Sequence, residues 1–225
     1  MAVAVRTAGV VVINWGTVSD PAAQNITTVS GDKGVAVSTT AYTTAGFTVS
    51  YTLNGLAPDH TYSFPGTFDE VGHFINVWLN PAIGTLALDP VFDSVITDGP
   101  TCIVCPLTST NDISVVGGDA DSFIGDGVAT ATAASGTGDL ALAFAQNYGS
   151  VPTIGGAGAA NVTNANQNQN GERTQGFTVT AGALTSTATS TGDTYPTVAL
   201  VVLRDGGAAP VVAATIPALA FAHNF

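Results

Sequence analysis

The chain has 225 residues, of which 45% are hydrophobic and only 9% are charged, against roughly 25% charged residues in an ordinary soluble domain. This length is enough for one large β-sandwich or two small ones, each with an apolar core. The net charge of −12 comes from 16 acidic and four basic residues. We therefore expect no binding of nucleic acid or of an anionic membrane surface, which needs clustered cations. The basic residues are Arg6, Lys33, Arg173 and Arg204.

Apolar and polar residues alternate with period two, and Gly, Pro, Asn and Asp interrupt them at short intervals, which predicts strands joined by turns. The clearest predicted strand spans residues 47–53, where Phe47, Val49, Tyr51 and Leu53 face one side. Other predicted strands, in chain order, span residues 3–14, 35–39, 74–79, 102–107, 128–133, 176–180 and 184–189. We therefore predict an all-β fold, a β-sandwich or jelly roll of about ten strands.

Two segments in the second half of the chain are predicted to form core strands. Leu140, Leu142 and Phe144 alternate with alanines, so they share one face of a strand. Residues 198–203 are apolar without a break, which is typical of a central strand covered on both faces. The expected body of the fold spans residues 1–205. Two small sandwiches divided near residues 100–111 are the alternative organisation.

Two stretches have neither the helical nor the strand period. Residues 155–171 are rich in Gly, Ala, Asn and Gln, and we expect an exposed loop. Residues 206–225 form an apolar tail in which Pro210 and Pro217 favour an extended path over a membrane-spanning helix. Because this tail would expose apolar surface to water, we expect it to pack on another subunit. The residues expected to dock are Val211, Val212, Ile216, Leu219, Phe221 and Phe225.

Residues 56–62 resemble a turn of fibronectin type III domains. Leu56, Pro58 and Tyr62 fit the Leu-x-Pro-x-x-x-Tyr pattern of that family. The resemblance implies that Tyr62 forms a tyrosine corner, a buried ring whose hydroxyl bonds to the backbone near residues 56–58. Tyr62 is therefore a predicted structural residue. Pro65 and Gly66 depart from the family pattern, because they cut short the strand expected after Tyr62.

A second resemblance covers roughly residues 112–205. The order is a Ser-Phe-Ile-Gly strand end at 122–125, a small-residue segment at 131–135, a Gly-Asp-Leu strand from Gly138, and an apolar final strand at 195–203. This pattern resembles a β-sandwich family common in phage virion proteins. The resemblance implies a structural or attachment role without catalytic residues.

Cys102 and Cys105 form the only cysteine pair of the chain. A structural zinc site needs further Cys or His ligands, which the neighbouring sequence lacks. On a strand the odd separation points the two side chains to opposite faces. We therefore expect two thiols that pack in different layers.

The acidic, glycine-rich segment 117–127 is predicted to be a turn between strands. Ca²⁺ takes six to eight oxygen ligands, and closely spaced carboxylates and carbonyls supply them. Asp119, Asp121 and Asp126 are therefore candidate calcium ligands. The alternative is an acidic turn that binds no metal, because the segment lacks a final bidentate Glu and does not repeat.

The three histidines, His60, His73 and His223, lie far apart and no nucleophile elbow accompanies them, so we expect that the chain is not an enzyme. We expect a virion structural protein at the virion surface: a capsid decoration, spike or fibre subunit that forms homo-oligomers and docks on other virion proteins. The alternative is an extracellular carbohydrate-binding or adhesin module that recognises a host surface glycan. Exposed aromatic rings would favour the alternative; Tyr148 is the best candidate, whereas Trp78 is expected in the core.

Overall fold

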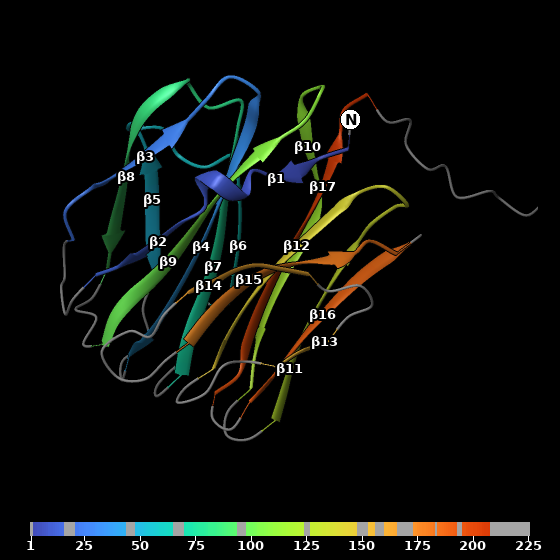
Figure 1. Cartoon of the computed structure of the whole chain (residues 1–225). Coiled ribbons are helices and arrows are strands. Elements are labelled where there is room, and N and C mark those ends of the chain that lie inside the picture. Colours follow the sequence, from blue (N-terminus) through green and yellow to red (C-terminus); the bar gives the residue numbers. More distant parts are fainter. Residues whose placement is uncertain are drawn as a thin grey trace, which may run out of the picture.

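A computed structural model of the whole chain shows how the strands are arranged (Figure 1). It describes residues 2–15, 21–43, 48–64, 70–93, 98–123, 127–147, 153–155, 160–165, 173–182, 184–192 and 195–207. In these residues the fold is all-β, as predicted, and the one helical element is a 3-10 turn, η1 (Thr7–Gly9). None of the described segments forms a helix long and apolar enough to cross a membrane.

The first half of the chain forms two antiparallel sheets. The first inner sheet has the strand order β1-β9-β4-β7-β6. Strand β2 also pairs with β9, at other residues than β1 does. The first outer sheet has the order β3-β8-β5. The strands are β1 Ala4–Val5, β2 Val11–Asn14, β3 Gln24–Thr28, β4 Asp32–Thr43, β5 Val49–Leu53, β6 His60–Phe64, β7 Glu70–Leu79, β8 Gly84–Phe92 and β9 Asp98–Thr108.

The second half repeats this plan with two further antiparallel sheets. The second inner sheet has the order β10-β17-β12-β15-β14, and the second outer sheet has the order β11-β16-β13. The strands are β10 Ile113–Ser122, β11 Gly127–Ala134, β12 Leu140–Asn147, β13 Thr153–Gly155, β14 Ala160–Ala165, β15 Arg173–Thr180, β16 Thr185–Gly192 and β17 Thr197–Asp205. The chain passes from the first pair of sheets to the second between β9 and β10.

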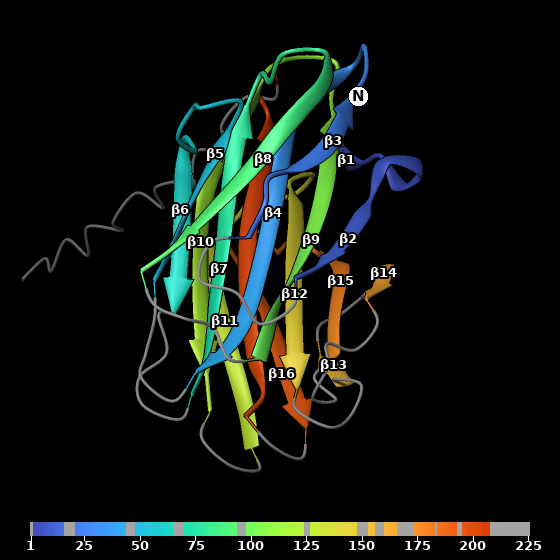
Figure 2. The same ribbon diagram turned by 90° about the vertical axis from the view of Figure 1, so that its left-hand side faces the viewer.

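Three apolar cores fix the stacking of these sheets as first outer, first inner, second inner and second outer (Figures 1 and 2). The first core lies between the first outer and inner sheets and includes Tyr51, Leu88 and Trp78. The middle core joins the two inner sheets through side chains that include Ile75, Ile103, Leu142, Phe144 and Val201. The third core is built mainly from alanines, among them Ala131, Ala143 and Ala188. The molecule is therefore two sandwiches packed face to face.

The inner strands are apolar on both faces because each face meets a different core. In β17, Val198, Leu200 and Val202 enter the third core, while Ala199, Val201 and Leu203 enter the middle core. This confirms the prediction of a central strand at residues 198–203. Val49, Tyr51 and Leu53 are buried on one face of β5, as predicted, and Phe47 lies outside the described residues.

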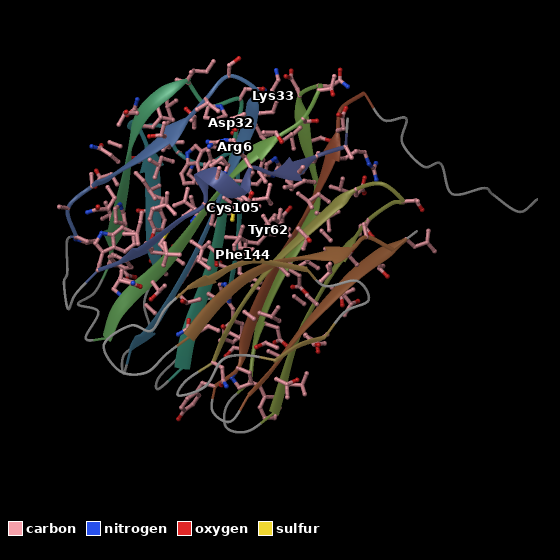
Figure 3. All side chains as sticks on the ribbon, in the orientation of Figure 1. Arg6, Asp32, Lys33, Tyr62, Cys105 and Phe144 are labelled. Atoms are coloured by element: carbon pink, nitrogen blue, oxygen red, sulfur yellow. The ribbon has the colours of Figure 1, made fainter. Side chains whose placement is uncertain are left out.

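The two cysteines lie in different layers, as their spacing predicted. Cys102 belongs to the first core and Cys105 to the middle core, where Figure 3 labels it near Tyr62 and Phe144. Burial raises the pKa of the Cys102 thiol to about 12 and raises that of Cys105 as well. Both side chains are therefore packed, protonated thiols with little reactivity.

Two strand predictions need correction. The strand predicted at residues 3–14 is broken into β1, η1 and β2. The break lies opposite Pro106, whose carbonyl accepts the Arg6 N–H at 2.9 Å. Since the N–H and C=O of a strand residue point the same way, the N–H that Pro106 lacks would face this same edge, so the ladder has no donor there.

The predicted loop at residues 155–171 contains a strand, β14, which pairs with β15 at the edge of the second inner sheet. An edge strand is paired on one side only, so it does not need the apolar residues that mark a central strand. The composition of residues 155–171, which predicts a loop, therefore does not reveal strand β14. Short strands such as β1, β2 and β13 also carry no periodicity, which is why the structure has more strands than the expected ten.

A buried polar contact crosses the middle core. His73 of β7 is fully buried, with its Nε2 2.9 Å from Ser38 Oγ of β4 and its Nδ1 3.1 Å from Thr197 Oγ1 of β17. These contacts join the first inner sheet to the second. Burial lowers the pKa of His73 to about 3, so the ring is neutral in the folded protein at pH 7.

We expect His73 to make stability depend on pH. Between pH 6.5 and about 3 the unfolded chain protonates His73 and the folded chain does not, so stability falls as the pH falls, by about 1.4 kcal/mol per pH unit for one proton. In urea unfolding at several pH values, His73→Gln should show a shallower slope than the wild type over this range. Equal slopes in the two proteins would contradict the assignment.

Candidate docking site

The candidate calcium ligands lie on a strand and not in the predicted turn. Asp119 and Asp121 belong to β10, and Asp126 lies outside the described residues. Asp119 accepts hydrogen bonds from the backbone N–H groups of Ala120 at 2.9 Å and Thr132 at 2.8 Å. Asp121 accepts one from Thr130 N at 2.7 Å. In the part of the chain that the structure describes, no three His, Cys, Asp or Glu side chains form a group that could hold a metal ion.

These bonds explain why the carboxylates stand there. Strand β11 is an edge of the second outer sheet, so every other N–H along it has no strand partner. Thr130 and Thr132 are two such residues, since both donate to the aspartates of β10. The two carboxylates therefore tie the inner sheet to the outer sheet and cover an edge that would otherwise be open to pairing with another chain.

The glycines before the aspartates let neighbours approach β10 closely. A Cβ on Gly117 would lie 3.3 Å from Ala134 N of β11, and a Cβ on Gly118 would overlap the ring of Tyr62. Tyr62 lies on β6, so its half-buried ring crosses from the first inner sheet to the second and joins the middle core (Figure 3). The sequence Gly-Gly-Asp-Ala-Asp is thus explained by packing between sheets.

The tyrosine-corner hydrogen bond predicted for Tyr62 is not formed with the described backbone at residues 56–58. The carbonyl of Leu56 accepts its side-chain hydrogen bond from Trp78 Nε1, at 3.0 Å. Tyr62 keeps a structural role through its ring, which packs against Gly118. The side-chain hydrogen bond to this backbone, which the resemblance implied for Tyr62, is made by Trp78 instead.

One end of the body, the tail end, gathers the strand termini from which the chain leaves. Here β17 ends at Asp205, β7 ends at Leu79 and β8 begins at Gly84 (top of Figure 1). At this end Gly206 N donates to Asp112 O at 2.7 Å beside the β10–β17 ladder, and Lys33 Nζ of the first sandwich lies 3.2 Å from Asp112 Oδ1. The docking residues predicted in the tail, 211–225, lie outside the described residues.

A hollow of about 280 Å³ opens at the tail end of the first sandwich. Its walls come from the connections β5–β6 and β7–β8, and its apolar lining includes Leu53, Leu56, Trp78, Pro81 and Leu86. Trp78 is buried, whereas Leu56 is 69% exposed and the neighbouring Ile83 is 68% exposed. Two large apolar side chains are thus exposed to solvent beside an apolar hollow, which makes the hollow a candidate docking site.

The walls of the hollow are held by hydrogen bonds within the chain. Asn54 and Gly55 have positive φ values of 51° and 78°, and they form the two-residue turn that returns the chain to Leu56. Asp59 accepts a bond from Leu79 N at 2.7 Å, and Asn80 N donates to Lys33 O at 2.9 Å. The hollow is therefore formed by contacts of the chain itself, and such a preformed site has a low ordering cost of binding.

The base of the tail is also fixed. Asp205 accepts hydrogen bonds from Ser109 Oγ at 2.7 Å, Asn111 Nδ2 at 2.6 Å and Gly207 N at 2.9 Å. These bonds lower the pKa of the Asp205 carboxyl well below its ordinary value, with Ser109 as the largest cause. A polar hollow lies beside Asp205. It is lined by Lys33, Thr110, Asn111, Asp112, Gly206 and Gly207. The tail therefore starts from a defined position.

The described basic side chains are all paired with aspartates. Arg6 makes a two-bond contact with Asp32, both bonds 2.8 Å, and Arg204 makes the same contact with Asp139 (Figure 3 labels the first pair). Lys33 pairs with Asp112. All three pairs lie at the tail end, so three of the four basic residues of the chain neutralise acidic groups there.

Sequence reasoning missed the hollow, although a signal for it exists. Leu56 and Ala57 follow an Asn-Gly turn, and Pro81, Ala82 and Ile83 form another connection. Turns are usually polar, so apolar residues at the tips of two connections are a signal for a candidate docking surface. Comparison of the chain with protein-family models, with curated proteins and with solved structures found no match.

We expect Trp78, and not Tyr62, to be sensitive to loss of its polar atom. Tyr62→Phe keeps the ring on Gly118, so it should change the free energy of unfolding by less than about 0.5 kcal/mol. Trp78→Phe removes the bond to Leu56 and part of the core, and should cost about 2 kcal/mol. Denaturant unfolding of the two variants provides the measurement. A cost for Tyr62→Phe equal to that for Trp78→Phe would restore the tyrosine corner.

Asp119 provides a test of the calcium interpretation. Both of its carboxylate oxygens already accept backbone hydrogen bonds, so we expect the melting temperature to be the same in excess Ca²⁺ and in chelator. Asp119→Ala should lower the free energy of unfolding by about 1 kcal/mol in both buffers, because Thr132 N loses its partner. A rise in melting temperature with Ca²⁺ that Asp119→Ala abolishes would instead establish a bound ion.

Proposed function

We propose that this chain is a non-catalytic structural subunit of a virion surface, a decoration, spike or fibre protein that docks through its C-terminal tail. One observation carries the proposal: the chain leaves the β-sheet body at Asp205, a position held by hydrogen bonds, and continues as an apolar tail. A tail of this composition has to bury its apolar residues against a surface. The body supplies a scaffold and the tail supplies attachment to other subunits.

The arrangement of the second sandwich supports the virion part of the proposal. Of the four segments that carry the resemblance to phage virion proteins, the first includes the end of β10, the second lies mostly in β11, the third leads into β12 and the fourth contains most of β17. The strands β10, β11, β12 and β17 all belong to the second sandwich, which supports treating it as the unit that the resemblance covers. The proposal includes homo-oligomers and contact with other virion proteins.

An extracellular carbohydrate-binding or adhesin module is the second candidate, and it would use the opposite end of the body. Phe123 follows β10 at that end and is 44% exposed, so its ring is accessible for stacking on a sugar. Trp15 and Trp78 are buried and unsuited to this role. Tyr148 lies outside the described residues. Binding to a glycan array that Phe123→Ala abolishes would favour this candidate.

We expect removal of residues 208–225 to abolish assembly and leave the fold intact. In the part of the chain that the structure describes, the three cores are complete sheet-to-sheet contacts of residues that precede Gly207, so the shortened chain should keep the circular dichroism spectrum of a β protein and behave as a monomer. Light scattering reports the mass in solution, and incorporation into particles reports docking. If the shortened chain assembles like the wild type, attachment through the tail is wrong.

A further inference from the structure

We propose that the hollow at the tail end receives the apolar tail, residues 208–225, of a second copy of this chain. The inference rests on the proposed function, since it names the surface on which the docking tail closes. The acceptor residues are Leu56, Trp78 and Ile83, and the donor segment is residues 208–225 of the neighbouring copy.

The size and chemistry of the hollow suit a side chain of the tail. An apolar cavity of about 150 Å³ is enough to hold a benzene ring, so a hollow of about 280 Å³ admits one aromatic ring and a smaller apolar neighbour. In an extended chain Phe221 and Phe225 lie about 13 Å apart. One of the two rings therefore enters the hollow, and the exposed Leu56 and Ile83 cover the apolar residues beside it.

The length of the tail and the point where it starts allow this contact. Gly207 lies beside Lys33, whose carbonyl accepts the N–H of Asn80, and Asn80 lines the hollow. Donor segment and acceptor hollow therefore share the tail end of the body. An extended chain from residue 208 to 225 spans up to about 60 Å, so the tail reaches the hollow of an adjacent copy.

The protein surface between Gly207 and the hollow of the same molecule is polar, which favours a second copy as the acceptor. It is occupied by the polar hollow with its Lys33–Asp112 ion pair and Asn111. An apolar strip laid across it would desolvate charged groups without offering them partners. Pro210 and Pro217 also favour an extended path over the reversal that a return to the same molecule requires.

The charge distribution allows two acidic copies to meet at this end. The chain carries a net charge of −12, and like-charged copies repel each other. Three of its four basic residues lie at the tail end in the pairs of Arg6, Lys33 and Arg204. The tail itself contains no Asp, Glu, Lys or Arg, so its docking adds no repulsion.

The acceptor is tested in the full chain with the pair Leu56→Asp and Ile83→Asp. Both positions are more than two-thirds exposed, so the fold should be unaffected. We expect the dissociation constant for self-association, measured by sedimentation, to rise at least about tenfold. The matched control is Leu184→Asp, a leucine that is 70% exposed on the second sandwich, which should leave the constant within about twofold.

A mixing experiment separates exchange between copies from docking within one molecule. The double variant Phe221→Asp and Phe225→Asp replaces the aromatic rings of the tail and leaves the hollow unchanged. The Leu56/Ile83 variant replaces apolar residues at the hollow and leaves the tail unchanged. Each variant alone should be monomeric, and an equal mixture should form a mixed complex with one tail in one hollow. Loss of association in each variant without complex formation on mixing would overturn docking between copies.

Failure of the hollow as the acceptor and failure of tail docking as a function give different results. If the tail variant fails to associate but the hollow variant associates like the wild type, the tail docks elsewhere, so this inference is wrong and the proposed function stands. If the tail variant itself associates like the wild type, both the inference and tail docking are wrong.

Discussion

The apolar contact between the two inner sheets is the constraint on which most of this structure depends. Because each inner sheet is covered on both sides, its central strands must be apolar at successive positions. β17 and β9 meet this demand, and the two cysteines of β9 divide between two cores for the same reason. His73 and Tyr62 reach across the same contact. The two sandwiches are thereby joined into one body.

The features that the sequence predicted well are those that follow from local periodicity. The buried face of β5, the doubly covered strand β17 and the opposite orientation of Cys102 and Cys105 all depend on the alternation of side chains along a strand. The features it missed depend on distant partners. The composition of residues 117–121 predicts an acidic turn, because the contacts of this segment with β11 and Tyr62 are not visible in the sequence. Trp78 replaces Tyr62 as the anchor of Leu56 because β7 lies beneath that turn.

The candidate docking site shows the same division. The tail could be singled out from the sequence, since its composition alone requires burial. The hollow could not, because its walls come from two connections separated by more than twenty residues, and only the pairing of β6 with β7 brings them together. The ion pairs of Arg6, Lys33 and Arg204 likewise join residues distant in the chain. They concentrate the few cations of an acidic protein at the end from which the tail departs.

The central claim is that a neighbouring tail fills the hollow beside Trp78. A density map of the assembled subunits tests this most directly, because it shows the contents of the hollow and the chain to which they belong. We predict density for an aromatic side chain against Leu56 and Ile83, continuous with Gly207 of an adjacent copy. An empty hollow, or density that leads back to Gly207 of the same molecule, would contradict the account.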